Sequence, residues 1–240
     1  MKNKKTRVII ISVILVLIIG IAIFCVVKNR NTGNSNQTTG LAKIYEKMTK
    51  NNVYKISFEL NEDSKYTISR KDNKANIDTY NNGTHIAETV KDGNTYYLIY
   101  STNTYYEYEN NDTELTQLTD EINEIITNNQ APAKGQEDID GKKYRYEEYK
   151  DISYFAFNID EDTVNKEVST KFYFKGDKLQ YIKTKIGDKE ELVKVDLSYD
   201  VKEDVFEIPS NFNNGAESTG TTENTEDAET AENTIDNTIE

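Results

Sequence analysis

Residues 82–100 read NGTHIAETVKDGNTYYLIY, and this stretch decides the fold class. Asn82-Gly83 and Asp92-Gly93 favour two-residue hairpin turns, because Asn, Asp and Gly tolerate a positive φ. The segments that follow the two turns, 84–90 and 95–100, have the length of β-strands. The stretch therefore predicts antiparallel strands joined by tight turns.

The same pattern continues through most of residues 41–213. Turn dipeptides recur at Asp140-Gly141, Gly176-Asp177 and Gly187-Asp188. These turns separate further expected strands at 104–108, 142–149, 168–175, 178–186 and 192–199. Ahead of them, YKISFEL at 54–60 alternates apolar and polar residues, which predicts a half-buried strand. We therefore expect a meander of antiparallel neighbours.

Two segments have helical spacing instead. Apolar residues recur every three or four positions in LAKIYEKMTK at 41–50 and in TELTQLTDEINEIIT at 113–127. The polar segment 128–138, which contains Pro132, is expected to be a loop between two runs of strands. We expect a mainly β, α+β domain over 41–213, with one antiparallel sheet and helices on one face. A single domain is preferred over two because neither run of strands alone has a second layer to cover its apolar face.

Residues 8–27, VIIISVILVLIIGIAIFCVV, form an uncharged apolar run long enough to cross a membrane as one helix. Four bases in the tail 1–7 predict that the N-terminus is cytoplasmic and that the main domain is extracytoplasmic, on a single-pass anchor in the cell membrane. A cleaved signal peptide would need a small-x-small site, which is not evident here. Acylation of Cys25 is the minor alternative, since Phe24 fits poorly before a lipidated cysteine.

The segments on either side of the domain are biased in composition. Residues 28–40, KNRNTGNSNQTTG, predict a flexible linker. Residues 214–240 contain eight acids, no base and no aromatic residue, which predicts a disordered acidic tail. The whole chain has a formal charge of -13, so nucleic acid is not an expected partner. An acidic domain would also be repelled by anionic lipids, which is why an anchor is needed to hold it at a membrane.

Few residues are suited to catalysis or metal binding. The single Cys and single His exclude a disulfide within the chain, a Cys-rich zinc site and a multi-His site, so we expect no cofactor and no metal. His85 is expected to face water or to pack beside a tyrosine, and nothing near it resembles a nucleophile elbow. We therefore expect a protein that is not an enzyme. A hydrolase with paired carboxylates is a distant third possibility.

Tyrosine is abundant, with seventeen residues that concentrate in 96–108 and 144–149. Ordinary packing within a sheet is the simpler interpretation of this bias, and a recognition surface is the alternative. The segment 95–100 is apolar on both faces. It is therefore expected to be covered on two sides or to line a cavity.

Three short motifs resemble those of the LolA/LppX-like lipoprotein-carrier superfamily. They are FEIP at 206–209, ISF at 56–58 and KFYF at 171–174, and the resemblance spans about 41–212. It implies an unclosed β half-barrel whose concave face, capped by helices, shields acyl chains or a lipoprotein anchor. This chain departs from the family in its apparent transmembrane anchor. In the family, an arginine helps to hold the lid closed. The only arginines of the domain 41–213 are Arg70 and Arg145, and neither lies in a motif that would identify it as that residue.

Alternation along the strands gives the side chains expected to line such a cavity. They are Ile56, Phe58, Leu60, Leu98, Tyr100, Phe172, Phe174, Val193, Val195 and Leu197. Each of them could equally be core beneath the helices. The expected function is that of a membrane-tethered, non-enzymatic protein that binds a lipid or a lipoprotein acyl chain. The alternative is a cell-surface interaction or sensor module that binds protein or glycan through Tyr-rich outer strands, and neither alternative names a protein partner.

Overall fold

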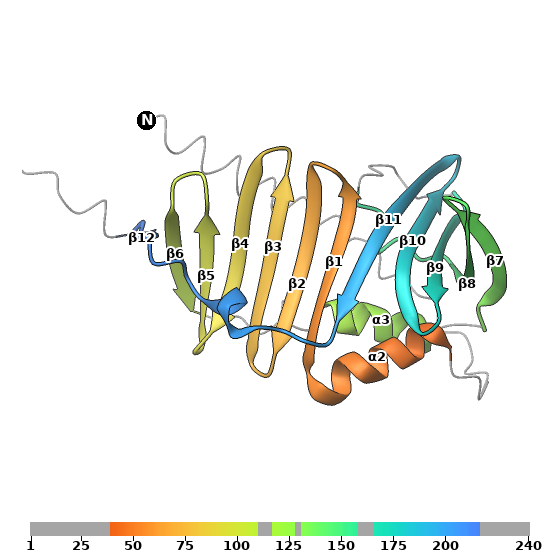
Figure 1. Ribbon diagram of the computed structural model, residues 1–240, viewed down its shortest axis with the longest axis horizontal. Coiled ribbons are helices and arrows are strands. Elements are labelled where there is room, and N and C mark those ends of the chain that lie inside the picture. Colours follow the sequence, from red (N-terminus) through yellow and green to blue (C-terminus); the bar gives the residue numbers. More distant parts are fainter. Residues whose placement is uncertain (1–38, 110–116, 128–130, 158–165, 217–240) are drawn as a thin grey trace, which may run out of the picture.

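The computed structural model describes residues 39–109, 117–127, 131–157 and 166–216. These residues form one twelve-stranded sheet with two α-helices and a short 3₁₀ helix (Figure 1). The first run of strands is β1 (Val53–Asn61), β2 (Ser64–Lys71), β3 (Lys74–Asn81), β4 (Thr84–Lys91), β5 (Asn94–Ile99) and β6 (Thr104–Glu109). The second is β7 (Ala133–Ile139), β8 (Lys142–Lys150), β9 (Val168–Lys175), β10 (Lys178–Ile186) and β11 (Lys189–Ser198). The expected mainly β fold with an unclosed sheet and helices is confirmed.

Tight turns connect most neighbouring strands. At Asn82-Gly83 both residues have positive φ, 48° and 80°, as a two-residue turn that matches the twist of its strands requires. Asp92-Gly93 and Asp140-Gly141 have the same geometry. The expected hairpin turns are therefore confirmed at these dipeptides.

The two runs of strands are antiparallel meanders joined in the middle of the sheet. β1, the first strand, pairs with β11, with Ile56 opposite Leu197 and Phe58 opposite Val195. The sheet order is β12-β6-β5-β4-β3-β2-β1-β11-β10-β9-β8-β7. β12 (Asn213–Asn214) is the exception to the antiparallel pattern, because it runs parallel to β6 at one end of the sheet. The sheet therefore ends at β7 on one side and at β6 and β12 on the other.

Helices α2 (Gly40–Asn51) and α3 (Gln117–Thr127) cover one face of the sheet, called here the helix face (Figure 1). The Glu147 carboxylate on β8 accepts hydrogen bonds from the backbone N–H groups of Gly40 (2.8 Å) and Leu41 (3.2 Å). It thereby satisfies two of the unpaired donors at the start of α2. The helices bury their apolar side chains against β1 and β8–β11, which confirms the expectation of helices on one face of one sheet.

Several expected boundaries need correction. Gly40, placed in the linker, lies in α2, and Asn214, placed in the acidic tail, pairs in β12. The segment expected to be a loop at 128–138 contains most of β7, a strand at the sheet edge that exposes side chains on both faces and so lacks apolar alternation. The expected helix 113–127 is described only from Gln117.

The expected anchor and most of the flanking segments lie outside the described residues. This applies to the tail 1–7, the helix 8–27, the linker up to residue 38 and the acidic tail from residue 217. Within the described residues, neither α-helix has the length and hydropathy needed to span a bilayer.

Candidate functional site

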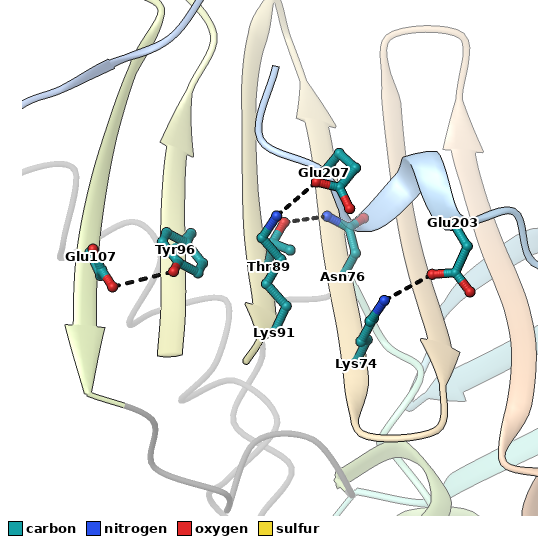
Figure 2. Close-up of polar contacts among 8 residues, drawn as sticks. All are labelled: Lys74, Asn76, Thr89, Lys91, Tyr96, Glu107, Glu203 and Glu207. Atoms are coloured by element: carbon teal, nitrogen blue, oxygen red, sulfur yellow. Dashed lines mark hydrogen bonds and ion pairs between the residues drawn. The ribbon is translucent and has the colours of Figure 1, made fainter. Parts of the chain in front are cut away.

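The candidate site lies on the strap face, which is the face of the sheet opposite the helices. Strands β1 to β4 alternate, so the residues between the apolar core positions point to this face. Here they are polar but buried: Ser57, Thr67, Ser69, Asn76 and Thr89. The Ser57 and Thr67 hydroxyls are hydrogen-bonded at 2.9 Å, and Asn76 Nδ2 donates to Thr89 Oγ1 at 2.9 Å (Figure 2). These five side chains form a polar floor.

A C-terminal segment covers this floor. We call residues 201–212 the C-terminal strap; it includes η2 (Glu203–Phe206) and crosses β3 and β4 (Figure 1). The side chain of Phe206, in the middle of the strap, is fully buried. The chain then adds β12 to β6, where the N–H of Gly215 donates to the carbonyl of Tyr105 at 2.9 Å. The strap is therefore fixed at its middle and at its end.

Ion pairs hold the strap to the strands below. Glu203 pairs with Lys71 (2.6 Å) and Lys74 (3.0 Å), and Glu207 pairs with Lys91 (2.9 Å). Figure 2 shows the pairs with Lys74 and Lys91. Hydrogen bonds from these lysines lower the pKa values of Glu203 and Glu207. Both carboxylates are largely exposed, so the pairs contribute more to orientation than to stability.

Between the floor and the strap is a pocket of about 320 Å³. Side chains from β1 to β5 and from the C-terminal strap surround it: Lys55, Lys65, Thr67, Ser69, Asn76, Asp78, Thr89, Leu98, Tyr100, Asp204, Val205, Glu207 and Pro209. Most of these side chains are polar. The pocket has the size of a small-molecule site, at the lower end of the usual range of roughly 300–1,000 Å³.

Tyr100 forms an aromatic wall of the pocket and is held in place by other rings. The His85 ring stacks on Tyr100 with centroids 3.6 Å apart, and His85 Nε2 lies 3.0 Å from Asp78 Oδ1. Phe212 contacts the Tyr100 ring edge-on at 5.1 Å. Burial, with a smaller contribution from the Asp78 charge, raises the pKa of Tyr100, so this side chain stays neutral and hydrogen-bonding at physiological pH. The expectation that His85 packs beside a tyrosine is confirmed.

The ten predicted site residues do not share one face. Eight of them, on β1, β9 and β11, lie in the core beneath α2 and α3: Ile56, Phe58, Leu60, Phe172, Phe174, Val193, Val195 and Leu197. Leu98 and Tyr100 lie on the opposite face, in a smaller cluster with Ala87 and Phe212. Placing all ten in one cavity is therefore wrong, because Leu98 pairs across the strands with Ala87, whose side chain points to the strap face.

The eight core residues pack against other side chains of the helix face. The ring of Phe58 lies 5.3 Å from that of Phe157 and 6.0 Å from that of Phe155, and Phe155 lies 5.4 Å from Phe172. By contrast, Leu98 and Tyr100 line the pocket. The expectation that 95–100 is covered on two sides or lines a cavity is thus confirmed for its strap face.

Two tyrosines proposed as a recognition surface have packing partners. The Tyr146 ring covers Gly135 so closely that a Cβ atom there would lie 2.6 Å from the ring, and Lys171 Nζ lies 4.6 Å from its centroid. The Tyr106 ring covers Gly215 in the same way. Aromatic side chains that shield a glycine on the next strand stabilise that pairing. These two residues are therefore accounted for by the architecture of the sheet.

Sequence reasoning missed the polar floor. Thr67, Ser69 and Asn76 lie on β2 and β3, a hairpin whose turn contains Asp72 with a φ of 56°. Asp72-Asn73 is a weaker turn signal than Asn-Gly. Polar residues that alternate with apolar ones are also typical of a solvated strand face. The available signal was the FEIP motif, whose Phe206 and Ile208 need an apolar surface to cover.

No metal-binding arrangement occurs in the part of the chain that the structure describes, where no three His, Cys, Asp or Glu side chains are grouped to hold an ion. The pocket offers hydroxyls, an amide, a phenol ring and charges of both signs. This set can hydrogen-bond and stack on a polar solute.

Comparison with known proteins gives little further information. No protein-family model matches this chain, and no curated protein does. Among solved structures, the chain is similar to an uncharacterized conserved protein from Thermus thermophilus. The two are 8% identical, and the match covers 73% of this chain and 98% of the other at a TM-score of 0.37. This likeness is too distant to bear on function.

Proposed function

We propose that this chain is a membrane-tethered, extracytoplasmic and non-enzymatic protein that binds a small polar molecule between its sheet and its C-terminal strap. The observation that carries the proposal is the polar pocket of about 320 Å³ with a buried hydrogen-bonding floor. Burying a polar group is unfavourable unless it is hydrogen-bonded. Four of the five floor side chains satisfy this rule by bonding to one another, and Ser69 Oγ, which has no partner among the described residues, is the group that a ligand would satisfy.

The membrane tether rests on the sequence. The apolar run 8–27 would place the domain outside the cell on a linker, and the described domain begins at the capped start of α2. The Glu147 carboxylate holds the first residues of α2 against β8, so the linker would join a fixed point on the helix face. The strap face would then be free to meet solutes.

Lipid binding, in a half-barrel of the lipoprotein-carrier type, is the second candidate. The observation in its favour is that eight predicted lining residues share the helix face beneath α2 and α3. These side chains fill the space by packing together, so an acyl chain would have to displace a helix. Each buried methylene contributes about 0.8 kcal/mol, so a long chain could offset that cost.

The test is native mass spectrometry of the full chain from bacterial membranes in mild detergent, with extraction of bound lipid and small molecules. Val205→Trp fills the pocket from the strap, and Leu192→Trp, at an exposed position on β11, is the matched control. We expect a stoichiometric polar ligand in the wild type and in Leu192→Trp that is absent from Val205→Trp. A bound lipid that Val205→Trp leaves in place would instead support the second candidate. An empty protein in every preparation would overturn both.

A further inference from the structure

We propose that the ligand of this pocket is a small hydroxylated anion, that is, a molecule with a carboxylate or phosphate group beside several hydroxyls. This inference rests on the proposed function and specifies its ligand. Three features of the pocket, as the described residues form it, support it: a buried serine without a partner, two lysines without partners, and a rigid aromatic wall.

The buried serine indicates hydroxyl recognition. Ser69 is 1% exposed and lines the pocket, and its Oγ has no hydrogen-bond partner among the described residues. An unsatisfied buried group of this kind costs roughly 1–3 kcal/mol. Thr89 Oγ1 accepts from Asn76, which leaves the Thr89 hydroxyl hydrogen available as a donor. A ligand hydroxyl both donates and accepts, so it can satisfy both of these groups.

Two lysines of the lining favour an anion. Glu207 is paired with Lys91, and Asp78 is hydrogen-bonded to His85, which neutralises this carboxylate only when the imidazole is protonated. Lys55 and Lys65 form no side-chain ion pair or hydrogen bond with any other residue of the described ranges. Asp204 is the remaining carboxylate of the lining without a side-chain partner in those ranges.

Two ammonium groups of the lining, those of Lys55 and Lys65, therefore have no counter-ion within the described residues, although the whole chain carries -13. An ammonium group without a partner attracts carboxylate or phosphate strongly, since hydrogen bonds between ionised groups are about twice as strong as neutral ones. Asp204 can accept a hydrogen bond from a ligand hydroxyl. The same set of groups therefore selects for both features of the ligand.

The wall limits the shape of the ligand. His85 stacks on the Tyr100 ring at an interplanar angle of 11° and Phe212 meets it at 78°, and these two contacts fix the orientation of the Tyr100 ring. A ring or a compact polyol can pack on this surface with its hydroxyls toward Ser69 and Thr89. The volume of about 320 Å³ suits one sugar-sized molecule.

The test measures binding of four probes to the full chain in detergent micelles by isothermal titration calorimetry. Glucuronate and glucose 6-phosphate carry the two candidate anionic groups, glucose is the neutral match, and inorganic phosphate has no carbon skeleton. We expect at least one of the two sugar anions to bind about tenfold or more tightly than both glucose and inorganic phosphate. The preference between the two identifies the anionic group.

Variants separate this inference from the proposed function. Lys55→Gln and Lys65→Gln should each weaken binding of the sugar anion by about fivefold or more, and Ser69→Ala by severalfold. Lys175→Gln, at an exposed lysine of β9 outside the pocket, should change nothing.

Equal affinity for glucose and the sugar anions, or lysine variants without effect, would overturn the anion while leaving a pocket ligand in place. Phosphate binding as tightly as the sugars would overturn the hydroxyl requirement. Failure of all four probes, with a different polar ligand recovered from membranes and lost in Val205→Trp, would overturn this inference alone.

Discussion

Glu137 shows how one charged side chain can secure the edge of a sheet. It lies on the edge strand β7 and accepts hydrogen bonds from Lys171 Nζ (2.9 Å), from the Tyr173 hydroxyl (2.9 Å) and from Lys183 Nζ. Burial alone would raise the pKa of Glu137, but the bonds from Lys183, Lys171 and Tyr173 outweigh it and lower the pKa to about 2. Because Tyr173 and the two lysines lie on β9 and β10, Glu137 ties β7 to strands beyond its neighbour β8.

The pH dependence of stability follows from the sign of this shift. The pKa in the folded state lies below the ordinary value of 4.5, so ionised Glu137 stabilises the fold fully above about pH 4.5 and loses that effect as the pH falls toward 2. Glu137→Gln should lower the free energy of unfolding at pH 7 by about 1 kcal/mol, since the cluster is only partly buried. Urea titrations at several pH values should show this difference shrinking below pH 4.5. Glu190→Gln, in a more exposed pair with Lys185, is the control. A difference that stays constant down to about pH 2 would contradict the assignment.

At the scale of elements, burial of Phe206 holds the C-terminal strap more firmly than its ion pairs do. Phe206 is 0% exposed, whereas the carboxylates of Glu203 and Glu207 are largely in solvent. Phe206→Ala should weaken local attachment of the strap by about 3–5 kcal/mol. Hydrogen exchange should then accelerate at the Asn213 and Gly215 amides, which bond to the carbonyls of Asn103 and Tyr105. Glu203→Gln and Glu207→Gln should leave that exchange nearly unchanged, and a larger effect from either than from Phe206→Ala would reverse the ranking.

Most elements could be predicted from local sequence. Hairpins with Asn-Gly or Asp-Gly turns were found because two consecutive positive φ values require those residue types. The β2–β3 hairpin and β7 were missed for different physical reasons. The turn at Asp72 has the left-handed geometry without a glycine to mark it, and β7 carries few apolar residues because it is an edge.

The candidate site was harder to predict than the elements, because it forms where one segment of the chain covers strands that are distant from it in the sequence. Ser69 lies on β2, and the strap that covers it begins at residue 201, in a distant part of the chain. Nothing near Ser69 in the sequence distinguishes a solvated strand face from a buried one. The apolar residues of the C-terminal segment carry that information: Val201, Val205, Phe206, Ile208 and Phe212.

At the scale of the whole molecule, the two faces are stabilised very unequally. In the described residues, the core of the helix face gathers eighteen buried side chains, most of them from both helices and from β1 and β8–β11. The buried clusters on the strap face are smaller: Ala87, Leu98 and Phe212 near β4 and β5, and Ile139, Tyr144 and Tyr173 at the other end of the sheet. Protection from hydrogen exchange rises with the number of buried apolar contacts, so we expect β4–β6 to open more readily than the rest of the sheet.

This gradient can be measured by native-state hydrogen exchange resolved by strand. Amides of β4–β6 should exchange at least about tenfold faster than those of β1 and β9–β11, because a difference of about 1.4 kcal/mol in opening free energy suffices for that ratio. Phe212→Ala should widen the gap by removing the side chain that joins the strap to Tyr100 and Leu98. Val193→Ala, in the core of the helix face, should instead accelerate exchange in β10 and β11. Uniform protection across all strands would mean that the sheet opens as one unit, since β1–β11 pairing would then couple the two meanders completely. The pocket is lined mainly by β1–β3 but also by Thr89 of β4 and Leu98 of β5, so a ligand that binds only the closed form should slow exchange in β4 and β5, which are expected to open early.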